Sequence, residues 1–174
     1  LDLMISQNGS IEAIQDGITC PVGSSSYYRI FDLAAYGANT DITVESISVG
    51  VFESLNDAQI EVNLYRYNGS LVANDLELVS SKTKSLPNSG LYYENVDING
   101  TFTPDETIVV EVSTQAGFVS GFTMGFNINS QTAPSYFKSD FCGFEDPIDM
   151  DGLFPGYGAL ISLNTTKAAF SVTQ

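Results

Sequence analysis

Five acidic side chains and one cysteine lie within the stretch SDFCGFEDPIDMD at 139–151, with no Lys or Arg among them. Three of these acids, Asp146, Asp149 and Asp151, are close in sequence and are followed by a glycine. Carboxylate oxygens are ligands that Ca²⁺ prefers, so the three are candidate calcium ligands, although their spacing is not that of an EF-hand. The alternative is a solvated acidic loop whose carboxylates cap turns.

Catalysis is disfavoured by the same residues. A glycosidase needs two carboxyl groups at a fixed separation across a sugar cleft, whereas these acids follow one another on a single segment. The chain has no histidine at all, which excludes a Ser-His-Asp triad and makes a catalytic zinc site very unfavourable. We therefore expect a protein that is not an enzyme.

The charge balance narrows the class of partner. With 21 acidic and 6 basic residues, the formal net charge is -15. This field repels polyanions, so nucleic acid and anionic polysaccharides are poor partners unless a cation bridges the charges. No apolar run reaches the length of a membrane helix, so we expect no membrane partner.

Tyrosines supply the candidate contacts to a ligand. In QIEVNLYRY, Tyr65 and Tyr67 alternate with Leu64 and Arg66 and lie on the face opposite the apolar positions. Exposed tyrosine rings stack on sugars and offer a hydroxyl group, although cross-strand packing is the alternative for each of them. The candidate ligand-binding residues are Tyr65, Tyr67, Tyr136 and Tyr157, with Asn129 and Asp140 as polar contacts.

Alternation of apolar and polar residues predicts strands almost everywhere. Turn signals separate the runs, among them YNGS at 67–70, LPNSG at 86–90, INGT at 98–101 and PGYG at 155–158. We predict strands at 2–6, 27–33, 43–53, 59–67, 76–83, 91–98, 107–113, 121–128, 158–163 and 168–173, and a long loop from 129 to 157. This pattern indicates an all-β fold, a two-sheet antiparallel β-sandwich of jelly-roll type. A closed eight-stranded barrel is the main alternative, and one domain is expected over 1–174.

Two further residue types have expected partners. Cys20 and Cys142 would form one disulfide in an exported protein, and two buried free thiols are the alternative. Arg29 and Arg66 lie in strands whose pattern indicates half-burial, so a structural ion pair with Asp32 or Glu61 as the partner is expected. An arginine that binds a ligand hydroxyl or carboxylate is the alternative.

Four segments in order carry a family resemblance: SSSYYRIFDLAAYG, QIEVNLYRYNG, TPDETIVVEVST and GFNINSQTAPSYFKSDFCGFEDP. The chain resembles the β-sandwich accessory modules of large secreted proteins from Bacteroidetes, in which one Cys precedes a YYR-FDL strand and a second lies in an S-Q-T-PSY…CG…P segment. The resemblance implies export, a disulfide and a non-catalytic role. The stretch FEDPIDMDGLF is more acidic than expected for these modules.

These observations together predict a non-catalytic carbohydrate-binding module of a secreted or cell-surface bacterial enzyme that degrades polysaccharides. It would be a monomer tethered to other domains, and it would bind a neutral polysaccharide near a separate catalytic domain. Calcium is the cofactor to test for. The alternative is a structural or protein-interaction spacer domain of a secreted protease or adhesin.

Overall fold

The computed structural model describes residues 2–8, 13–114, 121–129 and 131–167. The strands are β1 (Asp2–Ile5), β2 (Asp16–Ile18), β3 (Ser26–Asp32), β4 (Ile42–Ser54), β5 (Gln59–Tyr67), β6 (Leu76–Ser85), β7 (Ser89–Phe102), β8 (Thr107–Thr114), β9 (Phe122–Asn127), β10 (Ser135–Ser139), β11 (Phe144–Asp149), β12 (Gly158–Ala159) and β13 (Ile161–Lys167). Three short 3₁₀ turns, η1 (Ala34–Tyr36), η2 (Ala73–Asp75) and η3 (Met150–Gly152), connect them. Within these residues, no helix is long and apolar enough to cross a membrane.

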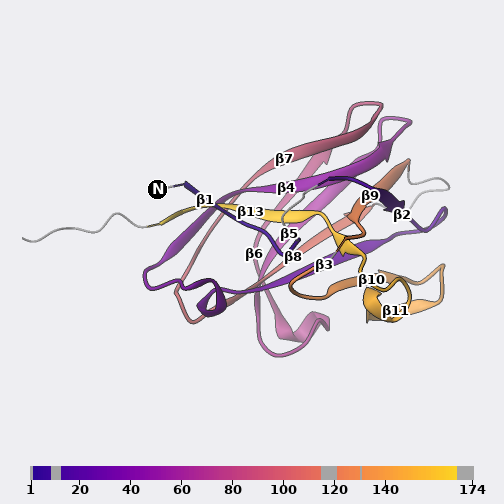
Figure 1. The fold of residues 1–174 in the computed structure, drawn as a ribbon. Helices are drawn as coiled ribbons and strands as arrows, with labels where there is room; N and C mark the ends of the chain where they lie inside the picture. The colour runs from indigo at the N-terminus through magenta and orange to yellow at the C-terminus, as the bar shows by residue number, and fades with distance from the viewer. Residues whose placement is uncertain (1, 9–12, 115–120, 130, 168–174) are drawn as a thin grey trace, which may run out of the picture.

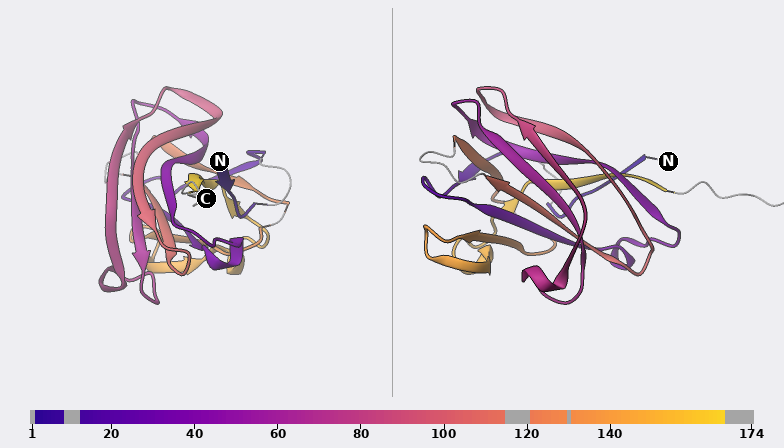
Figure 2. Two further views of the ribbon diagram at one scale, coloured as in Figure 1. Left: turned by 90° about the vertical axis from the view of Figure 1, so that its left-hand side faces the viewer. Right: turned by 180° about the vertical axis from the view of Figure 1, so that it is seen from behind.

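The strands form two packed antiparallel sheets, which confirms the predicted β-sandwich (Figures 1 and 2). The six-stranded sheet has the order β11-β10-β3-β8-β5-β6. The seven-stranded sheet has the order β1-β13-β4-β9-β12, with β2 paired to β9 and β7 paired to β4. From β3 to β9 the chain crosses repeatedly between the sheets, so most neighbours within a sheet are distant in sequence.

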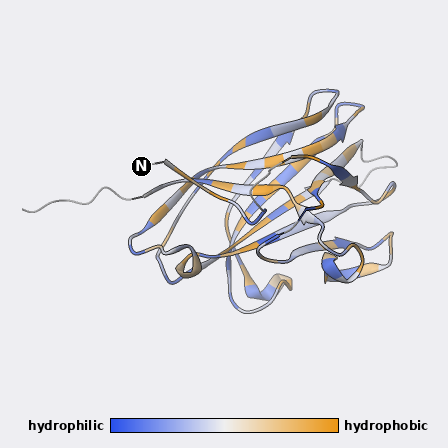
Figure 3. Ribbon diagram, viewed as in Figure 1, coloured by the Kyte–Doolittle hydropathy of each residue, from blue (hydrophilic) through white to orange (hydrophobic). Residues whose placement is uncertain are grey.

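The core lies between the two sheets and is built by the alternating side chains of both. Apolar and polar residues alternate along the strands, as Figure 3 shows by colour. One buried cluster includes Ile47 and Val49 from β4, Val62 from β5, and Val110 and Val112 from β8. The residues next to them in sequence point to the other face of each sheet. This is why alternation with one apolar face per strand predicts a sandwich.

The INGT segment is not a turn, contrary to the prediction. It lies inside β7, which continues to Phe102, and a register shift in the β4–β7 ladder between Val44 and Ser46 accommodates it. A Cβ atom on Gly100 would lie 2.8 Å from the Leu64 side chain. This glycine therefore allows close packing between the sheets rather than chain reversal.

The predicted loop from 129 to 157 is also wrong in part, because β10 and β11 form a hairpin within it. β11 contains Pro147 and lies at the edge of the six-stranded sheet, where a residue without an N–H is tolerated. The short strand β2 was not predicted either. The strand predicted at 168–173 lies outside the described residues.

The predicted disulfide is confirmed. Cys20 and Cys142 are bonded, with their Cα atoms 6.2 Å apart and a sequence separation of 122. Cys142 lies in the turn between β10 and β11, and Cys20 is fully buried in the segment before β3. The bond therefore ties the β10–β11 hairpin to the body of the sandwich.

The two arginines have partners other than those predicted. Arg66 pairs with Glu106 at 2.6 Å and with Glu77 at 3.5 Å, and its guanidinium lies 5.2 Å from the ring centre of Phe102. Its side chain points to the opposite face of β5 from Glu61, because residues at odd and even positions of a strand point to opposite sides.

Arg29 is fully buried and donates to four neutral acceptors rather than to Asp32. They are the Ala159 carbonyl at 3.0 Å, the Gln131 side chain at 2.9 Å, the Ala133 carbonyl at 2.6 Å and the Asn8 side chain at 2.8 Å. Burial lowers the pKa of this guanidinium. Arg29 thus joins three separate segments of the chain, while Asp32 caps the turn η1.

Candidate functional site

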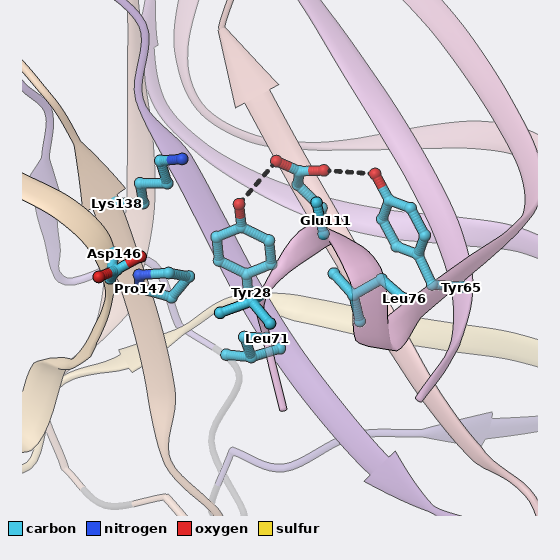
Figure 4. A pocket seen from close by; sticks show the side chains of 10 residues that line it. Tyr28, Tyr65, Leu71, Leu76, Glu111, Lys138, Asp146 and Pro147 are labelled. Carbon is cyan, nitrogen blue, oxygen red and sulfur yellow. Dashed lines mark hydrogen bonds between the residues drawn. The ribbon is translucent and has the colours of Figure 1, made fainter. Parts of the chain in front are cut away.

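A hollow of about 450 Å³ lies on the outer face of the six-stranded sheet. Its floor is made by Tyr28 from β3, Tyr65 from β5 and Glu111 from β8 (Figure 4). Because Tyr27 and Phe31 belong to the core, alternation along β3 turns Tyr28 away from it. The three floor residues therefore project from one face of three neighbouring strands.

Two walls of different character enclose this floor. One wall is the segment 71–76 around η2, which contributes Leu71, Val72 and Leu76. The other is the β10–β11 hairpin, which contributes Lys138, Asp146 and Pro147 (Figure 4). The hollow is thus apolar on one side and charged on the other, with aromatic rings at its base.

A hydrogen-bonded cluster holds the floor in place. The Tyr28 and Tyr65 hydroxyl groups each donate to one carboxylate oxygen of Glu111, both at 2.8 Å (Figure 4). The Asn63 amide donates to Glu111 at 3.3 Å and to Glu61 at 3.0 Å. Since three donors converge on Glu111, the two rings and the carboxylate hold one another in fixed positions.

Electrostatics keep both tyrosines protonated. Burial, followed by the negative charge of Glu111, raises the pKa of Tyr28 and also that of Tyr65 well above the usual value. A catalytic tyrosine nucleophile would need the opposite shift. The floor can therefore bind through rings and hydrogen bonds, but neither phenol is activated for chemistry.

The floor is part of a longer row of residues paired across the sheet. Asp149 in β11 lies opposite Tyr136, which lies opposite Tyr28, which lies opposite Glu111, which lies opposite Asn63. Burial, then the charge of Asp149 and the nearby Tyr67, raises the pKa of Tyr136. Of the candidate ligand-binding residues, Tyr65 lines the hollow, and Tyr67 and Tyr136 lie close to it.

The other candidate ligand-binding residues lie elsewhere. Tyr157 donates to Asp16 at 2.7 Å and packs on Phe126 and Phe154. Asn129 is exposed in the segment after β9, and its backbone N–H donates to the side chain of residue 127. Asp140 is exposed in the turn between β10 and β11. None of these three lines the hollow.

The three candidate calcium ligands point to two different places. Asp146 lines the hollow, whereas Asp149 and Asp151 line a second depression of about 360 Å³. Asp149 accepts a hydrogen bond from the Asp151 backbone at 2.9 Å, and Asp151 accepts one from Gly156 at 2.8 Å. Within the described residues, no three acidic, Cys or His side chains gather closely enough to hold a metal ion.

Sequence reasoning missed Tyr28 and Glu111 as functional candidates. Glu111 is the one charged residue inside the run TIVVEVST, on the face opposite Ile108, Val110 and Val112. An acid at such a position signals a polar outer face, but only strand pairing shows that two tyrosines surround it.

Comparison of the chain with models of known protein families finds no match, and comparison with curated proteins finds none either.

Proposed function

We propose that the chain is a non-catalytic carbohydrate-binding module of a secreted bacterial enzyme that degrades polysaccharides. Its hollow on the six-stranded sheet binds a neutral glycan and holds it near a separate catalytic domain. Binding acts by raising the effective concentration of substrate, not by chemistry. The observation that carries the proposal is the floor of Tyr28, Tyr65 and Glu111, in which two rings and a carboxylate are fixed before any ligand arrives.

The walls suit the two kinds of surface that a sugar has. The apolar side chains of Leu71 and Leu76 and the half-buried ring of Tyr65 match the C–H faces of a pyranose, while Lys138 and Asp146 match its hydroxyl groups. Glu111 and Asp146 lie in the same hollow, which disfavours an anionic sugar. Pre-organised polar groups limit the entropy that binding costs.

Two further observations support this function. The raised pKa values of Tyr28 and Tyr65 fit a binding surface rather than a catalytic one. A disulfide fits a protein exported to an oxidising compartment, as a polysaccharide-binding module at the cell surface would be.

Affinity electrophoresis through gels containing xylan, mannan or mixed-linkage β-glucan tests the proposal. We expect retardation on at least one gel. Tyr65→Ala should weaken it by about tenfold or more, because a ring contact and a hydrogen-bonded neighbour of Glu111 are lost together. Tyr93→Ala is the matched control, because Tyr93 lies on β7 in the other sheet and is 37% exposed.

Absence of retardation on every gel would refute the proposal and leave the spacer function as the better one. Retardation of Tyr65→Ala equal to that of the wild type would place binding outside the hollow. Parallel gels with EDTA test whether retention needs calcium.

A further inference from the structure

We infer that the floor of the hollow presents only hydrogen-bond acceptors and so selects glycans whose contacting positions are free donors. The favoured groups are unsubstituted hydroxyls and, more strongly, protonated amines, over O-alkylated or O-acylated positions. This inference rests on the proposed function. It narrows the neutral glycans to those with free hydroxyls and extends the ligand class to cationic glycans.

The argument begins with what each floor group can still offer. A carboxylate has no proton to donate, so every partner of Glu111 must be a donor. A tyrosine has a single O–H, and the hydroxyl groups of Tyr28 and Tyr65 both point it at Glu111, at 2.8 Å. The oxygen lone pairs of both phenols are therefore what remains for a ligand.

The amide beneath the floor adds no donor. Both N–H groups of Asn63 are engaged, since its Nδ2 donates to Glu61 at 3.0 Å and to Glu111 at 3.3 Å. Glu111 accepts three hydrogen bonds and has about four lone-pair directions, so it can accept one more. The floor of the hollow can therefore accept hydrogen bonds from a ligand but has no donor left to offer it.

Donors and acceptors are divided between floor and wall. Among the described side chains that line the hollow, Lys138 is the cationic donor, and it lies on the β10–β11 hairpin rather than on the floor. A sugar hydroxyl can donate to the floor while a ring or glycosidic oxygen accepts from Lys138. An O-methyl group in the same position has no proton to give and leaves floor acceptors without partners.

Three tetrasaccharides with one β-1,4 backbone test this inference: the glucosamine tetramer, cellotetraose and O-methylated cellotetraose. Affinities are measured by calorimetry at moderate salt and at a pH where the amines are protonated. We expect cellotetraose to bind about tenfold more tightly than its O-methylated form. The glucosamine tetramer should bind several-fold more tightly again, because its hydrogen bonds are charge-assisted.

Glu111→Gln separates hydrogen-bond polarity from steric exclusion. A glutamine at this site has one accepting oxygen and a donating NH₂, so one tyrosine O–H is released and turns towards the ligand. The preference for cellotetraose over its O-methylated form should then fall to about twofold or less. Glu53→Gln, on β4 in the other sheet, makes the same charge change and should keep the full preference.

Several results would overturn the inference. These are equal affinities for the three sugars, a reversed order, an unchanged preference in Glu111→Gln, or no measurable binding of any of the tetramers. The gel panel decides the proposed function separately. Retention there without selectivity among the tetramers would leave the module's function standing and remove only the inference about donors.

Discussion

Removing the disulfide is the perturbation whose cost can be worked out most directly. The bond joins Cys20 and Cys142 at a sequence separation of 122. In the chain-entropy model, a loop of this length restricts the unfolded state by about 5 kcal/mol at 25 °C, and measured losses in small secreted domains are about 2–5 kcal/mol. The double variant Cys20→Ala/Cys142→Ala should therefore lose about 3–5 kcal/mol of unfolding free energy.

This loss of unfolding free energy is large, but it is smaller than the whole stability of a typical domain. Folded domains have unfolding free energies of about 5–15 kcal/mol, so the variant should be weakened and still folded at low temperature. For a chain of this length, each kcal/mol corresponds to about 2–4 °C, which predicts a fall in Tm of roughly 10 °C. The hairpin keeps non-covalent contacts with the sandwich, because β10 stays paired with β3 and Phe137 stays in the core.

Urea unfolding of the oxidised wild type, the reduced wild type and the double variant measures this loss. Reduction should lower the wild-type midpoint to that of the variant, and the reductant should leave the variant unchanged. Amide exchange should rise first in the β10–β11 hairpin, because it is the element that the bond ties down. A stability change below about 1 kcal/mol, with normal exchange in the hairpin, would refute this account of the bond.

Three further predictions concern single side chains. Gly50→Ala in the central strand β4 should lower the unfolding free energy by about 2 kcal/mol or more, because the new Cβ would lie 2.6 Å from the Leu160 side chain. An unchanged midpoint of urea unfolding would contradict this. Arg29→Met should cost about 3 kcal/mol, because four buried acceptors lose their donor; a variant as stable as wild type would be evidence against that network. Hydrogen bonds from Tyr157 and from the Gly17 backbone N–H lower the pKa of Asp16. These bonds therefore stabilise the fold at pH values above 3.8, the ordinary pKa of the carboxyl group. The stabilisation is lost as the pH falls through the lower pKa of the folded state. The stability gap between wild type and Tyr157→Phe should thus be present at pH 6 and should narrow below about pH 3.8, whereas a gap that stays constant through acidification would exclude this linkage.

Local patterns were enough to predict much of the fold. The alternation in QIEVNLYRY predicts a strand at 59–67, and β5 has those same bounds. The two-sheet architecture follows from many such one-sided strands, and the disulfide follows from two cysteines in a chain expected to be exported. The hairpin β10–β11 could not be predicted in this way, because acids and Pro147 occupy a strand that has only one partner.

The candidate site was harder to predict, because it depends on pairing between strands far apart in sequence. Tyr65, Tyr67 and Tyr136 were identified by residue type, and the sandwich places them near one another. Tyr157 has the same chemistry but packs on the core near Asp16. Residue type alone therefore identifies a set of possible contacts, while the order β10-β3-β8-β5 decides which of them share a surface.

The register in which β8 pairs with β3 and β5 decides which side chains form the floor of the hollow. Glu111 lies between Tyr28 and Asn63 only because β8 pairs in this register with β3 on one side and with β5 on the other. A slip of one residue would turn Glu111 into the core and bring Val110 or Val112 to the outer face. Burying that carboxylate would be very unfavourable, so the alternation that stabilises the sandwich also fixes the acceptor at the base of the hollow. A variant that keeps the fold therefore also keeps this polarity unless it changes Glu111 or one of its donors.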